Sequence, residues 1–355
     1  ADYVSKVGSI DLSFIRDYQV NNEWLLQPTV GATYTHYTTP SYSESGAGVA
    51  GSDVDKFTTS EFLFNIGTKA NYKIDDSSKF ILFSDCHRGD NSFADDFANN
   101  RNIYFHALNH YFREGFEYCE LGDGDELWEN TNFESIFEAH KNVFQLLRKF
   151  HLHNRLHMVW GNHDMVYKDP EYVKKHLSSY FEPIDESEKE LFEGITYNEA
   201  IILKHTETEQ EVFLTHGHQA DWWNYIFWRC GRFLVRVLWK PLQVWGIADP
   251  TSPARNYTEL RKIERRLKKW ILQNDLLITV VGHTHRPRFP EPGDIPLFND
   301  GSCVHPRSIT GIEIENGHIS LIKWQISTTD GGTLKVVRVL LEGPQKLIDY
   351  QKAKN

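Results

Sequence analysis

Residues 79–87, KFILFSDCH, decide the fold: a short apolar run ends in an aspartate and a histidine. An apolar run of this length between polar residues predicts a buried strand. The pattern returns at 118–123 (YCELGD) and 157–164 (HMVWGNHD), and the intervening segments 93–115 and 132–150 have helical character. Strands that alternate with helices predict an α/β core with parallel strands.

The second half of the chain continues this pattern. Further strand candidates are 200–205 (AIILKH), 212–218 (VFLTHGH) and 276–285 (LLITVVGHTH), with a helical block over about 220–272. Alternating apolar residues around Asn316-Gly317 predict a β-hairpin, because Asn-Gly favours a tight turn.

Polar side chains cluster where the predicted strands end. Ligands of α/β sheets bind outside the carboxyl ends of the strands, so we expect these side chains to share one rim. They are Asp85, His87, Asp123, Asn162, His163, Asp164, His216, His218, His283 and His285. Carboxylate and imidazole ligands without thiolate suit two divalent metal ions, first Mn, with Fe or Zn as alternatives. A shared carboxylate would hold the pair roughly 3.5–4 Å apart.

The blocks DCH, GD, GNHD, HGH and GHTH, in this order, resemble the five signature blocks of the calcineurin-like metallophosphoesterases over about residues 79–325. The resemblance implies a four-layer αββα sandwich. It implies a first metal held by Asp85, His87, Asp123 and His285, and a second held by Asp123, Asn162, His216 and His283. A metal-bound hydroxide would attack phosphorus. His163 would act as general acid, with its ring oriented by Asp164.

Within that superfamily, Gly122-Asp123, Glu126 and Trp128, together with GHTHRP at 282–287, resemble the UDP-2,3-diacylglucosamine pyrophosphatases. That group usually has arginine where this chain has His163, and residues 1–75 have no counterpart there. The resemblance implies hydrolysis of a phosphodiester or pyrophosphate bond, with a nucleotide-linked lipid such as UDP-2,3-diacylglucosamine as candidate substrate. Two alternatives stay open: a broad phosphodiesterase acting on soluble nucleotides or organic phosphodiesters, and a non-catalytic scaffold with this fold.

Other residues near these blocks are candidates for substrate binding: Arg88, His218, His305, Arg307, Arg229, Arg232 and Arg236. For His218 the alternative is support of His216, and for Arg88 it is a solvated surface position. We expect Cys86 to be a buried thiol. Glu126 and Trp128 either shape the site or simply pack.

A helical insertion, residues 219–275, carries an unusual charge for this acidic protein. Residues 221–275 contain eleven basic and five acidic residues. Arg229, Arg232, Arg236 and Lys240 form one helical stripe among aromatic residues, so segment 222–240 is a candidate peripheral membrane contact. The resemblance to the UDP-2,3-diacylglucosamine pyrophosphatases implies that the insertion forms a lid over the active site. The alternative is packing on the protein or dimerisation, and a homo-oligomer is one open option.

Composition limits the remaining possibilities. The chain has 355 residues and a net charge of −11, so we expect no nucleic-acid partner. Its four cysteines form no CxxC pair, which predicts free thiols. Neither a signal peptide nor an apolar stretch of roughly 20 residues is visible, so we expect a cytoplasmic protein, soluble or peripheral to the membrane.

The domain organisation follows from shifts in composition. Segment 33–53 is rich in Ser, Thr, Gly and Tyr, and predicts irregular chain within an N-terminal extension over 1–75. We expect the phosphoesterase domain at 76–345 and a C-terminal tail at 346–355.

Overall fold

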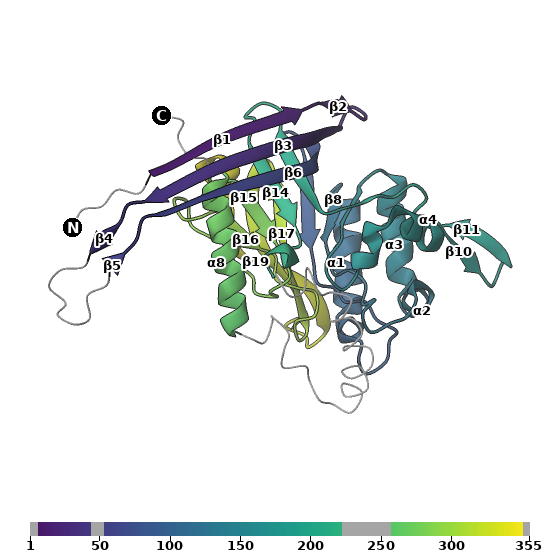
Figure 1. Cartoon of the computed structure of the whole chain (residues 1–355). Coiled ribbons are helices and arrows are strands. Elements are labelled where there is room, and N and C mark those ends of the chain that lie inside the picture. The colour runs from purple at the N-terminus through teal and green to yellow at the C-terminus, as the bar shows by residue number, and fades with distance from the viewer. Residues whose placement is uncertain (1–5, 44–52, 222–256, 351–355) are drawn as a thin grey trace. The chain divides into compact units, whose positions relative to one another are not determined.

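The computed structural model describes residues 6–43, 53–221 and 257–350 (Figure 1). The chain divides into two compact units, Ala1–Tyr72 and Lys73–Asn355. Each unit has strands of its own, and the second contains every one of the motif blocks.

A seven-stranded sheet of the second unit contains the first three motif strands. The strand order is β12 (Tyr197–Asn198), β9 (Leu156–Val159), β8 (Glu117–Leu121), β7 (Lys79–Phe83), β17 (Ser308–Glu315), β18 (His318–Thr328) and β19 (Leu334–Lys346). The strands β7, β8 and β9 are parallel neighbours, as expected, while β17, β18 and β19 are antiparallel. The predicted hairpin at Asn316-Gly317 is therefore the β17–β18 connection.

Four further strands of this unit lie together in a second sheet: β13 (Ala200–His205), β14 (Glu211–Thr215), β15 (Ile278–Val281) and β16 (Leu297–Asn299). The strands β14, β15 and β16 are parallel to one another, and β13 is antiparallel to β14. The HGH and GHTH blocks follow the carboxyl ends of β14 and β15, where parallel strands deliver their loops to one edge.

Helices cover both sheets. They are α1 (Arg101–Arg113), α2 (Phe133–Ala139), α3 (Lys141–Leu152), α4 (Pro170–Leu177) and α8 (Tyr257–Gln273). Phe83 of β7, Tyr104 of α1 and Phe150 of α3 are fully buried in one core. On the other sheet, Ile263 and Ile271 of α8 pack in one cluster with strand residues including Val281 and Leu297. The predicted α/β fold class is confirmed.

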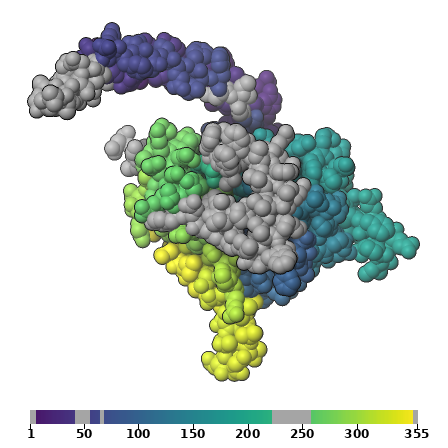
Figure 2. Space-filling model, turned by 60° about the horizontal axis from the view of Figure 1, so that its bottom comes forward, coloured from purple at the N-terminus to yellow at the C-terminus, as the bar shows by residue number. Residues whose placement is uncertain are grey.

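Two predicted helices differ in extent from the observed ones. Segment 132–150 is not one helix but two, because His140 leaves helical geometry at φ −124° and its Nε2 lies 2.8 Å from Asp95 Oδ2. The helix expected from residue 93 begins at Arg101, after a 3₁₀ turn at Asp96–Asn99 that the Asp95 carboxylate caps. Beyond α4, the hairpin of β10 (Ser179–Glu182) and β11 (Ser187–Glu190) projects from the body of this unit (Figure 1, Figure 2).

The prediction of an irregular N-terminal extension was wrong. The first unit is an antiparallel sheet in which β3 (Trp24–Thr39) pairs with β1 (Lys6–Ile15), β2 (Tyr18–Gln19) and β6 (Phe57–Ile74). Short strands β4 (Tyr42–Ser43) and β5 (Asp53–Val54) also pair. The Thr and Tyr residues that suggested loop are strong strand formers once a neighbouring strand pairs with them. Residues 44–52 of the predicted irregular segment lie outside the described residues.

Candidate metal centre

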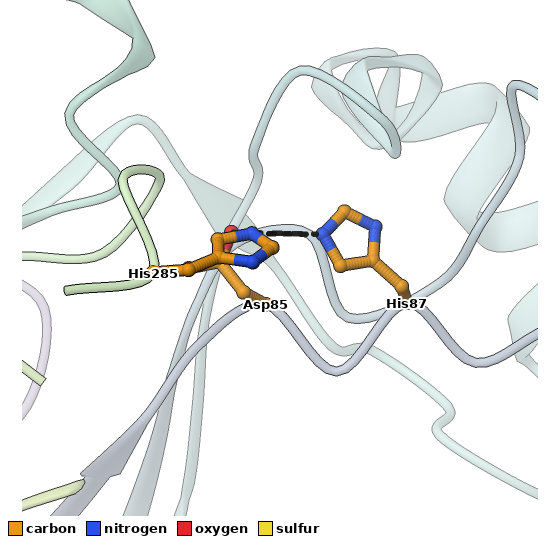
Figure 3. Close-up of side chains that lie close together, drawn as sticks. All are labelled: Asp85, His87 and His285. Atoms are coloured by element: carbon orange, nitrogen blue, oxygen red, sulfur yellow. Dashed lines mark hydrogen bonds and ion pairs between the residues drawn. The ribbon is translucent and has the colours of Figure 1, made fainter. Parts of the chain in front are cut away.

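Three side chains from two separate loops form the first candidate ligand cluster (Figure 3). His285 Nε2 lies 3.0 Å from Asp85 Oδ1, and His87 Nε2 lies 3.7 Å from the same oxygen. The two imidazole nitrogens are 3.4 Å apart. Asp85 and His87 follow β7, whereas His285 follows β15, so the ends of strands from both sheets meet here.

Asp123, His216 and His283 form a second cluster, in which one ligand atom from each residue lies within 4.8 Å of the others. His216 Nε2 is 3.1 Å from Asp123 Oδ2, and that same oxygen is 3.9 Å from His87 Nε2 in the first cluster. One carboxylate oxygen therefore faces both groups of ligands.

Buried ligand atoms in these clusters fit divalent cations. Asp85 Oδ1, Asn162 Oδ1, His216 Nε2 and His283 Nε2 are buried, and apart from close carboxylate–imidazole contacts they form no hydrogen bond with other described residues. Leaving such atoms unsatisfied is costly, whereas a cation would use them all. Mixed oxygen and imidazole donors also match the preferences of transition-metal dications.

Hydrogen bonds hold three of the candidate ligands by an atom other than the one left for a cation. His216 Nδ1 donates to the carbonyl of Leu121 at 2.8 Å, which leaves Nε2 for a metal. The Oδ1 atom of Asp123 accepts from the backbone N–H of His163 at 2.8 Å, which leaves Oδ2 between the clusters. Asp85 Oδ2 accepts from the Ser84 hydroxyl at 2.5 Å and the His283 N–H at 2.8 Å.

Charge reinforces this arrangement. Burial opposes ionisation of Asp85 and Asp123, but neighbouring histidines outweigh it and hold the pKa of each carboxyl well below its usual range. The largest lowering effect comes from His285 at Asp85 and from His216 at Asp123. Burial likewise opposes the charge on His216, yet Asp123 and Asp85 raise its pKa to about 9. The centre therefore carries tightly coupled opposite charges when no cation is bound.

Backbone strain is concentrated at the ligands. The φ angles are 50° at Asp85, 48° at His87, 51° at Asp123, 63° at His283 and 54° at His285, all in the left-handed region. Such residues cost about 1–3 kcal/mol each and persist where the surroundings force them. Strain at so many candidate ligands marks this rim as a functional site.

The glycines of the motif blocks make room for the ligands. A Cβ added at Gly161 would lie 2.2 Å from Asp123 Oδ1, and one at Gly282 would lie 2.1 Å from Ser84 Oγ. No side chain fits at either distance, because real Cβ contacts are essentially never shorter than 3.0 Å.

Glu126 has a clearer place than the sequence suggested. Its carboxylate accepts from Nδ1 of His87 at 2.9 Å and from Nδ1 of His163 at 2.8 Å. Trp128 stacks on the His163 ring at 4.4 Å between centroids. Burial opposes the charge of His163, but Glu126 and Asp123 raise its pKa above the ordinary value. The spacing of Glu126 three residues after Asp123 was the available signal, but its partners depend on the fold.

Asp164 does not orient His163, contrary to expectation. Its two carboxylate oxygens accept from the backbone N–H groups of Gly161, at 2.6 Å, and Gly124, at 2.8 Å. These bonds join the loops after β8 and β9. Burial, followed by repulsion from Asp123, raises the pKa of Asp164 to about 7. Glu126 is the group that contacts the His163 ring.

Arg88 is not a substrate contact either. Its side chain is 1% exposed, and its guanidinium lies 2.7 Å from both Glu120 and Asp125. Glu120 accepts from Nη1 and Nη2 and Asp125 accepts from Nε, so the two carboxylates hold the cation inside the core. The sequence could not reveal this because Arg88 directly follows a rim residue.

The remaining candidate residues differ in burial, and some lie outside the described residues. His218 is fully buried, and its ring centroid lies 5.4 Å from that of His216. His305 is half-buried and Arg307 is exposed, on the loop before β17. Cys86 is buried, as expected. Arg229, Arg232, Arg236 and most of the insertion lie outside the described residues.

Two family models match overlapping parts of the chain. Residues 1–86 match a family model described as autotransporter beta-domain. No curated protein matches the chain. None of the helices in the described parts of the chain has the length and hydrophobicity that a membrane span requires. Residues 78–287, more than half of the chain, match the family model of the calcineurin-like phosphoesterases, and this range contains all the candidate ligands named above. The chain therefore belongs to the calcineurin-like phosphoesterase family.

Proposed function

We propose that this protein is a dinuclear metal-dependent phosphoesterase that hydrolyses a phosphodiester or pyrophosphate bond. The observation that carries the proposal is the position of Asp123 Oδ2, 3.1 Å from His216 Nε2 and 3.9 Å from His87 Nε2. One cation would be held by Asp85, His87, Asp123 and His285. The other would be held by Asp123, Asn162, His216 and His283.

Two divalent cations, when bound in such a site, supply an activated water and neutralise charge on phosphoryl oxygens. The chain's own contribution begins with ligand placement. Hydrogen bonds to Leu121, to Glu126 and from the His163 N–H hold His216, His87 and Asp123, respectively, by the atoms not left for a cation. Preorganisation of this kind removes the cost of assembling the site during reaction.

His163 is the proposed general acid. Glu126 holds its Nδ1, so the other ring nitrogen is left to give a proton to the leaving oxygen. Stacking on Trp128 limits rotation of the ring. This assignment uses Glu126, and not Asp164, as the partner that orients the acid.

The proposed substrate is more specific than the family assignment. GD-x-x-E-x-W at 122–128 and GHTHRP at 282–287 favour a nucleotide-linked lipid such as UDP-2,3-diacylglucosamine as the first substrate to test. His163 stands where the UDP-2,3-diacylglucosamine pyrophosphatases usually have arginine, and this difference favours a soluble nucleotide or organic phosphodiester instead. Peripheral membrane contact through 222–240 belongs to the lipid version of the proposal.

A metal analysis and a turnover panel test the proposal. The purified protein, loaded in turn with Mn, Fe or Zn, is assayed on a phosphomonoester, a bis-aryl phosphodiester, a cyclic nucleotide and the UDP-linked lipid. We expect two ions per chain and turnover of a diester or pyrophosphate. A single ion per chain, or a preference for the monoester, would overturn the proposal, and loss of all turnover with both ions bound would favour the scaffold alternative.

A further inference from the structure

Ser84, which precedes the first ligand, lies between two buried carboxyl groups. Its Oγ is 2.5 Å from Asp85 Oδ2 and 2.7 Å from Asp300 Oδ1. All three residues are completely buried. Asp300 directly follows β16, a strand that supplies none of the candidate ligands.

The short contacts require a proton beyond the one on the hydroxyl. Ser84 can donate to only one of the two carboxyl groups, so the other contact must be a donation to Ser84. Asp85 Oδ2 already accepts from the His283 N–H, and Asp85 lies beside His285, which favours its ionised form. Asp300 Oδ2 forms no hydrogen bond with any described residue, a position that suits a neutral carboxyl better than a buried carboxylate.

The most consistent arrangement is therefore a chain of donors. The protonated Asp300 donates to Ser84 Oγ, and Ser84 donates to Asp85 Oδ2. Burial, and then repulsion from Asp85, raises the pKa of Asp300 well above its ordinary value, in the direction that this arrangement needs.

We propose that Asp300 is a positioning residue that acts through Ser84 to fix the rotation of the Asp85 carboxylate. With Oδ2 held by Ser84 and by the His283 N–H, Oδ1 is left facing His285 and His87. Asp300 would thus influence metal binding without contacting a metal. The inference deepens the proposed dinuclear function and depends on it.

Neighbouring contacts make the arrangement rigid. The Asp300 N–H donates to the Val281 carbonyl at 3.0 Å, which ties the end of β16 to the end of β15. Asn299 Nδ2 donates to the Gly282 carbonyl at 2.7 Å, in the loop that carries His283. Gly282 leaves the space that Ser84 Oγ occupies. The end of β16 therefore supports ligands from two loops.

The test measures binding of Mn²⁺ alone to the metal-free protein by calorimetry, in wild type and in Asp300→Ala, Asp300→Asn and Ser84→Ala. Loss of a residue that supports a ligand typically weakens metal binding about 10–100-fold, which we expect for Asp300→Ala and Ser84→Ala. The amide of Asp300→Asn can still donate to Ser84 Oγ, so this variant should bind Mn²⁺ within a few-fold of wild type. The double Ala variant should be no weaker than either single one, because both remove the same support.

A matched control separates positioning from loss of stability. Tyr111→Phe removes buried hydrogen bonds to Glu313 and Trp324 in the α1 core, so it should lower the melting temperature without changing Mn²⁺ affinity. Wild-type affinity in Asp300→Ala, or equal damage from Asn and Ala, would overturn the inference. If Asp300→Ala does not fold, Ser84→Ala against Asp300→Asn decides it. Absence of Mn²⁺ binding in the wild type would overturn the proposed function itself.

Discussion

Nδ1 of His163 lies 2.8 Å from the carboxylate of Glu126, which also holds His87 at 2.9 Å. One carboxylate thus couples the proposed general acid to a candidate metal ligand. A buried glutamate with two imidazole partners must stay ionised to accept from both, and its pKa is lowered to about 2: burial opposes the charge, but His163 outweighs it.

We first predict the effect of Glu126→Gln on the pH profile. Removing this charge lowers the pKa of His163, which Glu126 raises. A general acid works only while protonated, so activity is lost as pH rises through its pKa, and the alkaline limb of kcat should move to lower pH. We also expect kcat to fall about 10–100-fold, as for loss of other residues that support a ligand.

The kcat–pH profile of wild type and Glu126→Gln provides the measurement. His163→Gln is the companion variant, in which the limb assigned to this histidine should disappear. An alkaline limb that stays at the same pH in Glu126→Gln would show that another group is the acid.

The second prediction concerns the shared ligand. Asp123→Asn removes the negative charge whose Oδ2 lies between His87 and His216. Without that charge, two dications would repel each other, so turnover should fall at least about 100-fold, beyond the usual loss of a supporting residue. Metal content per chain, measured by mass spectrometry after dialysis, should fall below two. Retention of two ions together with full turnover would contradict the bridging role.

A third prediction uses the glycine beside this carboxylate. In Gly161→Ala the new Cβ would lie 2.2 Å from Asp123 Oδ1 and 2.5 Å from its backbone nitrogen. Because the backbone cannot move as a flexible side chain can, we expect a destabilisation of about 1–3 kcal/mol and weaker metal binding. Chemical denaturation and metal titration would measure both.

Gly331→Ala is the matched control. Its nearest atom is Thr329 Oγ1 at 3.9 Å, an ordinary contact, so stability and metal affinity should both remain near wild type. Equal effects of the two substitutions would show that the motif glycine is not constrained by Asp123.

The fourth prediction addresses the buried ion cluster. Arg88→Met leaves Glu120 and Asp125 buried without their cation, which should cost about 3–5 kcal/mol in the free energy of unfolding. Lys79→Met is the control, because Lys79 and Glu315 form a partly exposed pair worth about 0–1 kcal/mol. Urea denaturation compares the two variants. A similar small loss in both would show that the core compensates for the missing guanidinium.

The sequence alone was enough to predict the α/β class and six side chains that the structure brings into two clusters: Asp85, His87 and His285, and Asp123, His216 and His283. The reason is partly local: each block follows an apolar strand, and within one sheet parallel strands bring their carboxyl ends to one edge. Asp85 and His285 follow strands of different sheets, so their 3.0 Å contact also depends on how the two sheets pack.

The tertiary structure decided which partner each polar group takes. Arg88 turns into the core toward Glu120, Asp164 binds backbone N–H groups, and Glu126 takes the role expected of Asp164. Ser84 and Asp300 meet from positions 216 residues apart. Side-chain hydrogen bonds depend on distances of a few tenths of an ångström between loops. The order of parallel strands within a sheet sets which loops lie at one edge, but the packing of the whole domain sets those distances.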